Sequence, residues 1–118
     1  MDKKYKWFKI ADSLDDIAFS ENGIAECEIN GKQICLSFFK EQFCATSLKC
    51  PHAGGNLSHG YLDNSGNIVC PVHGYKFSLQ TGRNISGEGY YLKTYPVEKR
   101  ANGYFLGMEE TGLFNWLK

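Results

Sequence analysis

Short segments rich in apolar residues recur along the chain, and clusters of glycine, asparagine, aspartate and serine separate them. This pattern predicts β-strands joined by tight turns. We expect strands at Tyr5–Ala11, Gly23–Ile29, Lys32–Phe39, Phe43–Ser47, Gly74–Leu79, Leu92–Arg100 and Tyr104–Met108. Because proline cannot donate a ladder hydrogen bond, we expect Pro96 at a sheet edge or a bulge. The 13 glycines and the 14% of aromatic residues also suit an all-β fold with many turns.

The second and third of these segments are predicted to form a hairpin. Asn30 and Gly31 lie between them and suit the central positions of a type I′ turn, which need a positive φ. A two-residue loop pairs Cys27 with Ile34, and alternation then gives the hairpin one apolar face. The side chains on that face are Cys27, Ile29, Ile34, Leu36 and Phe38. Cys35 falls on the opposite face, so we expect no disulfide between Cys27 and Cys35.

The most specific pattern is a pair of short motifs in the middle of the chain, each with one cysteine and one histidine. One residue separates Cys50 from His52, two residues separate Cys70 from His73, and seventeen residues lie between the motifs. Thiolates suit iron–sulfur clusters, copper(I) and zinc, whereas imidazoles suit zinc, copper and iron. These four side chains are therefore the candidate ligands of a metal centre.

The spacing distinguishes between the candidate metals. Zinc ribbons pair their cysteines as C-x2–4-C and zinc fingers end in H-x3–5-H, and neither spacing occurs in this chain. A [2Fe–2S] cluster suits the pattern better, because Cys50 and Cys70 can bind one iron while His52 and His73 bind the other. A structural zinc module is the less favoured alternative.

This ligand pattern resembles the Rieske family, whose [2Fe–2S] cluster is held by two cysteines and two histidines. Residues around the motifs also look like the family: Gly54, Gly55, Leu57, Gly60, Gly74, Phe77, Thr81 and Gly82. Trp7 and the segment Tyr95–Val97 extend the similarity over most of the chain, up to about residue 108. The resemblance implies one [2Fe–2S] cluster, with these ligands: Cys50, His52, Cys70 and His73.

The resemblance also implies the architecture. In the family, an antiparallel β sandwich or barrel forms a base, and a small cluster-binding subdomain is inserted into it. A chain of 118 residues fits one domain. We therefore expect a single Rieske domain over residues 1–118, with the base at about 1–47 and 84–118 and the cluster-binding lobe at about 48–83.

The charge and hydropathy of the chain exclude several partners. Thirteen basic and thirteen acidic residues give a formal net charge of zero, whereas nucleic acids and anionic membranes attract a basic excess. No apolar run approaches a membrane span, and no apolar h-region follows the basic N-terminus, so we expect no signal peptide and a cytoplasmic location. The tail 109–118 is too apolar to stay free and is expected to fold back. Its apolar residues are Leu113, Phe114, Trp116 and Leu117.

The remaining cysteines and the histidine count argue for a protein without an active site. Outside the two motifs, the cysteines are Cys27, Cys35 and Cys44, expected to be reduced thiols that pack like small apolar residues. Family oxygenases add a mononuclear iron held by two histidines and a carboxylate. Of the three histidines here, only His59 is left after the cluster is bound. It lies in a glycine-flanked loop and lacks any mark of a general base for a hydrolase.

The resemblance implies a soluble Rieske-type ferredoxin, a monomeric one-electron carrier whose redox chemistry belongs to the cluster. In the family, such a protein passes electrons from a flavin-dependent ferredoxin reductase to the terminal oxygenase of a ring-hydroxylating dioxygenase system. The alternative is a small Rieske subunit held in a larger reductase, similar to the nitrite reductase small subunit. That group often lacks the ligands, and this chain has all four.

Several positions depart from the high-potential members of the family. Their two extra cysteines are matched here by Gly55 and Val72, and their serine and tyrosine hydroxyls by Tyr75 and Phe77. Hydrogen bonds to sulfur stabilise the reduced cluster, so their loss predicts a potential near the low end of the Rieske range of about −150 to +300 mV. The segment Ser86–Gly89 matches the loop that covers the cluster, where the family often has proline. Glycine in this segment predicts a softer cover.

Overall fold

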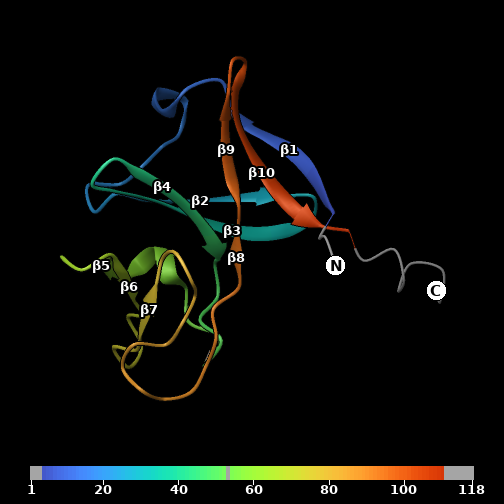
Figure 1. Cartoon of the computed structure of the whole chain (residues 1–118). Helices are drawn as coiled ribbons and strands as arrows, with labels where there is room; N and C mark the ends of the chain where they lie inside the picture. The colour runs from blue at the N-terminus through green and yellow to red at the C-terminus, as the bar shows by residue number, and fades with distance from the viewer. Residues whose placement is uncertain (1–3, 53, 111–118) are drawn as a thin grey trace.

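Antiparallel strands make up almost all of the regular structure of the chain (Figure 1). The computed structural model describes residues 4–52 and 54–110. Its strands are β1 (Tyr5–Ala11), β2 (Ile24–Ile29), β3 (Lys32–Phe39), β4 (Gln42–Ser47), β5 (Tyr61–Leu62), β6 (Asn67–Val69), β7 (Lys76–Ser78), β8 (Thr94–Tyr95), β9 (Val97–Arg100) and β10 (Gly103–Glu109). Its helical turns are the 3-10 segments η1 (Leu14–Asp16) and η2 (Leu57–His59). The expected all-β fold is confirmed, and within the described ranges no helix is long and apolar enough to span a membrane.

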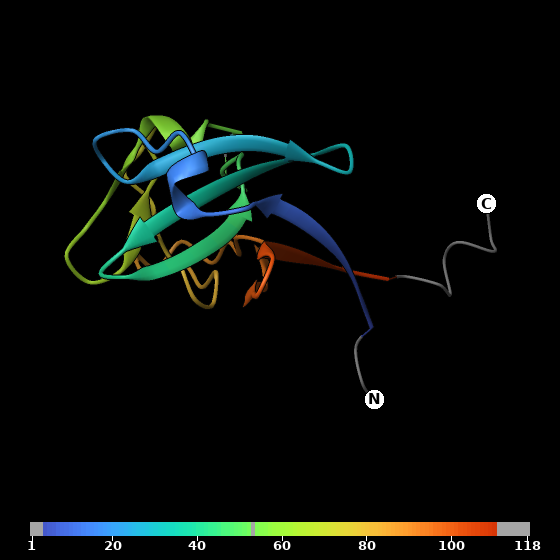
Figure 2. The same cartoon turned by 90° about the horizontal axis from the view of Figure 1, so that it is seen from above.

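The base consists of two sheets, with strand orders β1-β10-β9 and β2-β3-β4-β8. Both sheets contribute side chains to one apolar core, which is the arrangement of a β sandwich. Its buried members are Ala25, Ile34, Leu36, Ala45, Leu106 and Met108. Figures 1 and 2 show β1 beside β10 at one end of the molecule and the small sheet β5-β6-β7 at the other.

The hairpin of β2 and β3 has the predicted register. Asn30 and Gly31 have φ values of 50° and 77°, as a type I′ turn requires, and Cys27 pairs with Ile34. Ile34 packs into the base core, whereas Cys35 belongs to a second core on the other face of β3. As expected, Cys27 and Cys35 are separate free thiols.

The three cysteines outside the motifs are protected by burial. Desolvation raises the pKa of Cys35 to about 11, and it also raises the pKa of Cys27 and Cys44. A thiol reacts and binds metal as the thiolate, so a raised pKa disfavours both for these side chains. Their packing agrees with the prediction that they act as small apolar residues.

The turn between β3 and β4 is a second two-residue loop. Lys40 and Glu41 have φ values of 47° and 67°, and Phe39 pairs with Gln42 across the turn. A positive φ is uncommon for these residue types. The Lys40 ammonium donates to the Asn64 carbonyl (3.4 Å) and lies 5.2 Å from the Phe39 ring centroid, which fixes the turn against the lobe.

Pro96 divides the strand that was predicted over Leu92–Arg100. β8 pairs with β4 in one sheet, whereas β9 pairs with β10 in the other. Pro96 lies between β8 and β9 with no N–H to donate, and its carbonyl accepts a hydrogen bond from the Gly107 N–H (2.9 Å). The prediction of one strand was therefore wrong, because the chain passes from one sheet of the base to the other at this proline.

The third sheet, β5-β6-β7, forms a lobe between β4 and β8. Its core combines lobe residues with two side chains from β2 and β3. The members are Ile24, Cys35, Leu48, Cys50, Leu57, Ile68, Cys70, Phe77, Leu79 and Leu92. β7 is shorter than the predicted strand Gly74–Leu79, because Gly74 and Tyr75 close a tight loop before it.

Polar contacts fasten the lobe to the edge of the base. The Asn22 side chain donates to the Gly60 carbonyl (2.9 Å). On β2, the Glu26 carboxylate accepts hydrogen bonds from the Ser58 hydroxyl (2.7 Å) and the Asn56 amide (3.2 Å). These two bonds lower the pKa of Glu26, so its charge is retained near neutral pH.

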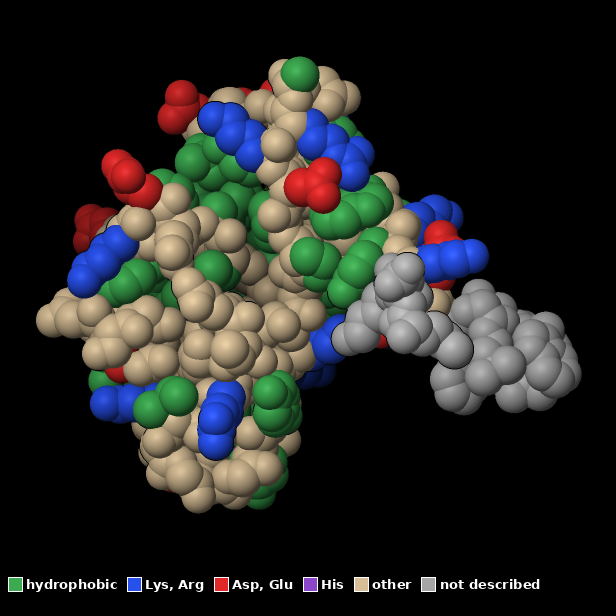
Figure 3. Space-filling view, viewed as in Figure 1, with side chains coloured by type: hydrophobic (Ala, Val, Ile, Leu, Met, Phe, Trp, Pro, Cys, Tyr) green, Lys and Arg blue, Asp and Glu red, His purple; other side chains and the backbone are tan. Residues whose placement is uncertain are grey.

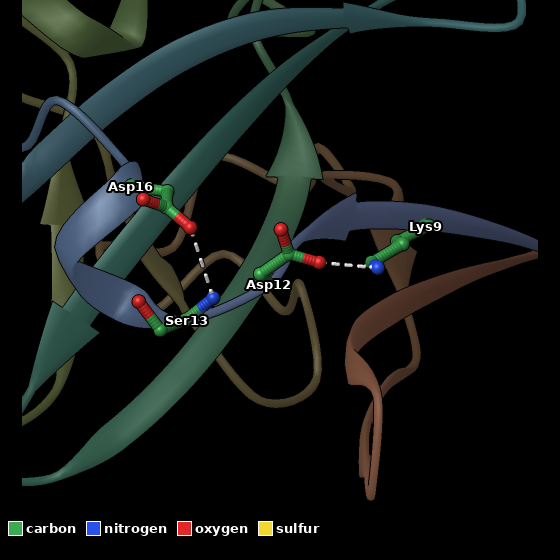
Figure 4. A network of polar contacts seen from close by, with 4 residues as sticks. All are labelled: Lys9, Asp12, Ser13 and Asp16. Carbon is green, nitrogen blue, oxygen red and sulfur yellow. Dashed lines mark hydrogen bonds and ion pairs between the residues drawn. The ribbon is translucent and has the colours of Figure 1, made fainter.

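The link after β1 is also held by polar side chains, as Figure 4 shows. Lys9 forms an ion pair with Asp12, and the Ser13 N–H donates to the Asp16 carboxylate (3.3 Å). The Asp16 N–H donates back to the Ser13 carbonyl (3.1 Å), which starts η1. This short helical turn therefore begins at a serine followed by acidic residues, as helix N-termini prefer.

Charged side chains of both signs are interspersed over the face shown in Figure 3, which agrees with the zero net charge.

β10 ends at Glu109, and the Glu110 N–H donates to the Lys4 carbonyl beside the start of β1 (2.8 Å). The fold-back was predicted for the tail 109–118, of which residues 111–118 lie outside the described residues.

Candidate metal centre

The first motif forms a loop that its own backbone closes. The Cys50 N–H donates to the Gly55 carbonyl (2.8 Å), and the Gly54 N–H donates to the Cys50 carbonyl (2.9 Å). Gly54 has a φ of 70°, a conformation that glycine adopts without a Cβ penalty. The loop therefore depends on this glycine two residues after His52.

The second motif has the same backbone frame. The Cys70 N–H donates to the Tyr75 carbonyl (2.9 Å), and the Gly74 N–H donates to the Cys70 carbonyl (3.0 Å). Gly74 has a φ of 73°, close to that of its counterpart in the first loop. Each loop thus begins at a cysteine and closes five residues later, although the histidine stands at a different place in each.

The two loops approach each other closely at Gly55 and Val72. A Cβ atom on Gly55 would lie 2.5 Å from Val72 Cγ2 and 3.2 Å from Cys70 Sγ, so a larger residue would push the loops apart. Cys50 and Cys70 are each only 2% exposed and belong to the lobe core. The loops therefore hold both thiols on their inner, apolar side.

The two histidines meet on the outer side of the loops. His52 is half-buried and His73 is exposed, and their Nδ1 atoms lie 3.4 Å apart. Two nitrogens bound to one tetrahedral metal at about 2.0–2.1 Å are separated by about 3.3–3.4 Å. The imidazole pair thus has the spacing of two ligands on a single metal.

The donor set fits a cluster of two metals. In residues 4–52 and 54–110, no three histidine, cysteine, aspartate or glutamate side chains converge as the ligands of one ion would. A [2Fe–2S] cluster needs only two protein ligands on each iron, because sulfides bridge the two irons. The structure brings His52 and His73 together and buries Cys50 and Cys70 in one core, which is compatible with that requirement. The role of these four side chains as cluster ligands stays a prediction.

Two tyrosines line the histidine side of the centre. The Tyr75 ring centroid lies 4.2 Å from that of His52, and the Tyr90 ring lies edge-on to His52 at 5.3 Å. The two tyrosine rings stack on each other at 5.9 Å. Desolvation, with a smaller contribution from the Glu88 carboxylate, raises the pKa of Tyr75, so its hydroxyl stays neutral. Tyr90 was not singled out in the sequence, because nothing in its local pattern links it to the ligand motifs.

The third histidine, His59, lies outside the two ligand loops, at the end of η2. His59 is exposed. Its charge adds to the hydrogen bonds from Ser58 and Asn56 in lowering the pKa of Glu26. His59 follows Ser58, which makes one of the polar contacts between lobe and base.

Comparison with known proteins agrees with this centre. The profile of the Rieske [2Fe–2S] domain matches residues 6–96, which include both loops. The ferredoxin component of the naphthalene 1,2-dioxygenase/salicylate 5-hydroxylase systems of a Ralstonia species is 33% identical over 97 residues, covering 81% of this chain and 90% of that protein.

Solved structures show the same fold. A chain in the complex of reduced oxygenase and oxidized ferredoxin in carbazole 1,9a-dioxygenase matches with a TM-score of 0.73 at 27% identity, covering 89% of this chain and 95% of that one. A structure described as an NADH-dependent nitrite reductase small subunit from Mycobacterium tuberculosis matches with a TM-score of 0.74 at 18% identity, covering 89% and 96%. With its domain profile, its fold and its two ligand loops in agreement, the chain belongs to the Rieske [2Fe–2S] domain family and carries one [2Fe–2S] cluster.

Proposed function

We propose that this protein is a Rieske-type ferredoxin, a soluble, cytoplasmic and monomeric one-electron carrier formed by one domain over residues 1–118. It accepts an electron from a flavin-dependent ferredoxin reductase and passes it to the terminal oxygenase of a ring-hydroxylating dioxygenase system. Relatives that match over most of the chain are ferredoxin components of such systems. The observation that carries the proposal is the imidazole pair, 3.4 Å apart on the open side of a lobe whose thiols are buried.

The ligand assignment follows from the two loops. Cys50 and Cys70 would hold one iron of the cluster, and His52 and His73 would hold the other. When bound, the cluster supplies the one-electron redox chemistry. The chain determines where an electron crosses, because the apolar lobe core closes the thiol side while the imidazole side faces solvent.

The docking surface of this ferredoxin lies at the more exposed imidazole. His73 is exposed, and Val72 beside it is 48% exposed. A partner can cover a small apolar surface without the cost of desolvating a charged group. Val72 and His73 therefore form the contact through which the electron leaves. Ala53, the neighbour of His52 in the sequence, lies outside the described residues.

The protein carries electrons and leaves the reaction on the organic substrate to its partner. A mononuclear iron site of the oxygenase kind needs two histidines and a carboxylate. Once the cluster is bound, His59 is the only histidine left in the chain. It is exposed at the end of η2, next to Ser58, which bonds to Glu26.

A second candidate function is a small Rieske subunit of a larger reductase. The nitrite reductase small subunit has the same fold, with a TM-score of 0.74, although at 18% identity the likeness concerns the fold alone. Purification from the source organism separates the two functions. A ferredoxin elutes as a monomer, whereas a permanent subunit remains bound to its reductase in a fixed ratio.

Metal analysis tests the cluster and its ligands. Protein made with iron available should contain two irons and two acid-labile sulfides per chain. Cys50→Ser should lose most of both, whereas the matched control Cys27→Ser alters a thiol in the base core and should keep them. Stoichiometric zinc in a colourless wild-type protein would overturn the assignment.

Electron transfer tests the function itself. When it is mixed with NADH and with a reductase and an oxygenase from the source organism, the protein should be required for product formation and should cycle between its oxidised and reduced spectra. Product formation at the same rate without this protein would refute the proposal.

A further inference from the structure

Residues 84–90, named here the cover loop, lie between β7 and β8 and are fastened to β7. The Ile85 N–H donates to the Lys76 carbonyl (2.8 Å), and the Lys76 N–H donates to the Ser86 hydroxyl (3.0 Å). In Figure 1 the chain from β7 to β8 forms the long loop at the lower edge of the molecule. The cover loop is thus held to the strand that follows the second ligand loop.

Asn84 is the hub of the hydrogen bonds inside the cover loop. Its side-chain nitrogen lies within donating distance of the Lys76 carbonyl (3.0 Å), the Ser86 hydroxyl (3.1 Å) and a Glu88 carboxylate oxygen (3.0 Å). Its side-chain oxygen accepts a hydrogen bond from the Gly89 N–H (2.8 Å). An amide can donate and accept at once, so this one side chain joins both ends of the loop.

The hydrogen bonds of Asn84 matter because two glycines allow the backbone of the cover loop many conformations. Gly87 and Gly89 have φ values of 90° and 86°, and a Cβ atom on either would meet nothing within 4 Å. Backbone freedom of this kind favours an open, mobile loop. The hydrogen bonds of the Asn84 side chain therefore restrain a backbone that these two glycines leave flexible.

The cover loop ends at Tyr90, whose ring contacts two residues of the ligand loops. The Tyr90 ring lies edge-on to His52 at 5.3 Å and stacks on Tyr75 at 5.9 Å. Tyr90 is 39% exposed, so its ring contacts both the solvent and the His52 ring. Its position makes the two imidazoles unequal, since His52 is half-buried while His73 is exposed.

We propose that Asn84 is a positioning residue for electron transfer: it holds the cover loop closed so that Tyr90 shields His52 from water. This inference rests on the proposed function, because it takes His52 as a cluster ligand. On reduction the cluster gains a negative charge, which water stabilises better than an aromatic ring does. A closed loop therefore keeps the potential low and leaves His73 as the route for the electron.

Substitutions at Asn84 and Tyr90 test the inference by redox titration. Asn84→Ala should favour the reduced state about three- to tenfold, a rise in midpoint potential of about 28 to 59 mV at 59 mV per tenfold. Asn64→Ala removes the same side chain from an exposed position at the turn between β5 and β6 and should leave the potential unchanged. Tyr90→Ala should raise the potential as Asn84→Ala does, whereas Tyr90→Phe keeps the ring and should match the wild type.

The double variant shows whether Asn84 acts through Tyr90. If it does, Asn84→Ala with Tyr90→Ala shifts the potential no further than the larger single change, because coupled sites are not additive. Additive shifts, or an Asn84→Ala potential equal to that of Asn64→Ala, would overturn the inference. Amide exchange gives a readout independent of the cluster: the Gly89 N–H should exchange at least tenfold faster in Asn84→Ala. Unchanged exchange at Gly89 would equally overturn it.

These outcomes can be distinguished from a failure of the proposed function. If the ligand assignment is wrong, the wild type lacks the spectrum of a [2Fe–2S] cluster with histidine ligands, and Cys50→Ser changes nothing. If only the role of Asn84 is wrong, the wild type and the variants share that spectrum, and Asn84→Ala keeps the wild-type potential, shifts it additively with Tyr90→Ala, or leaves exchange at Gly89 unchanged.

Discussion

At the scale of single residues, Phe77 offers a test of how side chains tune the cluster. Phe77 is fully buried in the same core as Cys50 and Cys70 and has no donor group. In Phe77→Tyr, a hydroxyl that donates to either ligand sulfur stabilises the reduced, more negative cluster. A bond that strengthens by about 1 kcal/mol on reduction raises the potential by about 40 mV. Redox titration of the purified variant measures this rise.

The control for this prediction is Phe8→Tyr, which adds the same hydroxyl in the base, where Phe8 packs on the other core. Its potential should equal that of the wild type. If the hydroxyl of Phe77→Tyr finds no acceptor, the buried donor costs about 1–3 kcal/mol of stability instead. Loss of stability with an unchanged potential would therefore show that the sulfur atoms lie out of reach.

A second prediction at this scale concerns Val72, whose exposed side chain lies beside His73. In Val72→Glu, a negative charge must be desolvated when a partner covers this surface, so electron transfer to the oxygenase should slow by roughly tenfold. The cluster spectrum should remain. Gln33→Glu adds the same charge at an exposed position on β3 and serves as the control. Stopped-flow rates that are equal for Val72→Glu and Gln33→Glu would contradict docking at Val72.

The residues of the centre differ in how far the sequence predicts them. The spacing of cysteine and histidine identifies the candidate ligands because metal chemistry requires those side chains at short separations. Asn84 and Tyr90 escape this reasoning, since they lie in an irregular loop and reach His52 only through tertiary structure. Glycine in the cover loop suggests softness, but a single asparagine side chain can replace the restraint that proline would give.

At the scale of elements, the sequence predicts turns best where backbone chemistry is explicit. Asn30-Gly31 sets the first hairpin correctly, because both residues tolerate a positive φ. Lys40 and Glu41 adopt the same kind of turn without such a signal, held by contacts with the lobe. Pro96 marks an interruption in the sequence, yet the change of sheet there depends on pairing with β4 and β10, which local pattern does not contain.

The structure also predicts which elements depend on the cluster. The loops 50–55 and 70–75 are closed by a few backbone hydrogen bonds, whereas β6 and β7 rest on the buried core of the lobe. Removing the cluster removes the link between the loops, and metal binding is coupled to their folding. Chelation should therefore speed amide exchange at Cys50 and Cys70 by at least tenfold, while amides of β3 and β6 keep their protection.

Hydrogen exchange followed by mass spectrometry or NMR checks this on the holoprotein before and after chelation. The amides of β3 serve as the internal control, because β3 contributes side chains to both cores and pairs on both edges. Unchanged exchange in the two loops would show that they are preformed without metal. Loss of protection in β3 would show that the base also depends on the cluster.

At the scale of the whole molecule, the two cores share the hairpin of β2 and β3. β2 packs Ala25 into the base core and Ile24 into the lobe core, and β3 packs Ile34 and Cys35 in the same way, so the lobe is built directly on the sandwich. Shared packing and the contacts of Glu26 with the lobe give the ligand loops a rigid support. A rigid support suits an electron carrier, because a cluster that moves little between redox states needs little reorganisation. The proposed contact with redox partners then lies on one exposed edge of the lobe, at Val72 and His73.

The last prediction concerns the midpoint potential of the wild-type protein. Phe77 offers no hydroxyl to the ligand sulfurs, and the Tyr75 ring lies against His52 at 4.2 Å, where it takes the place of a short hydroxyl donor. Gly55 and Val72 face each other in place of a disulfide between the loops. Without the two hydroxyl donors the reduced cluster is less stabilised, so the potential should lie near the low end of the Rieske range of about −150 to +300 mV.

A low potential determines the direction of electron flow. A reduced flavin can donate to such a cluster, whereas a quinol would be too weak a donor. Redox titration monitored by EPR at neutral pH measures the value directly. A midpoint above roughly +100 mV, in the upper half of the Rieske range, would place this protein with quinol-linked carriers, because a flavin reductase would then lose most of its driving force in the first transfer. A value below zero supports a chain of transfers from flavin to ferredoxin to oxygenase, in which each step runs downhill.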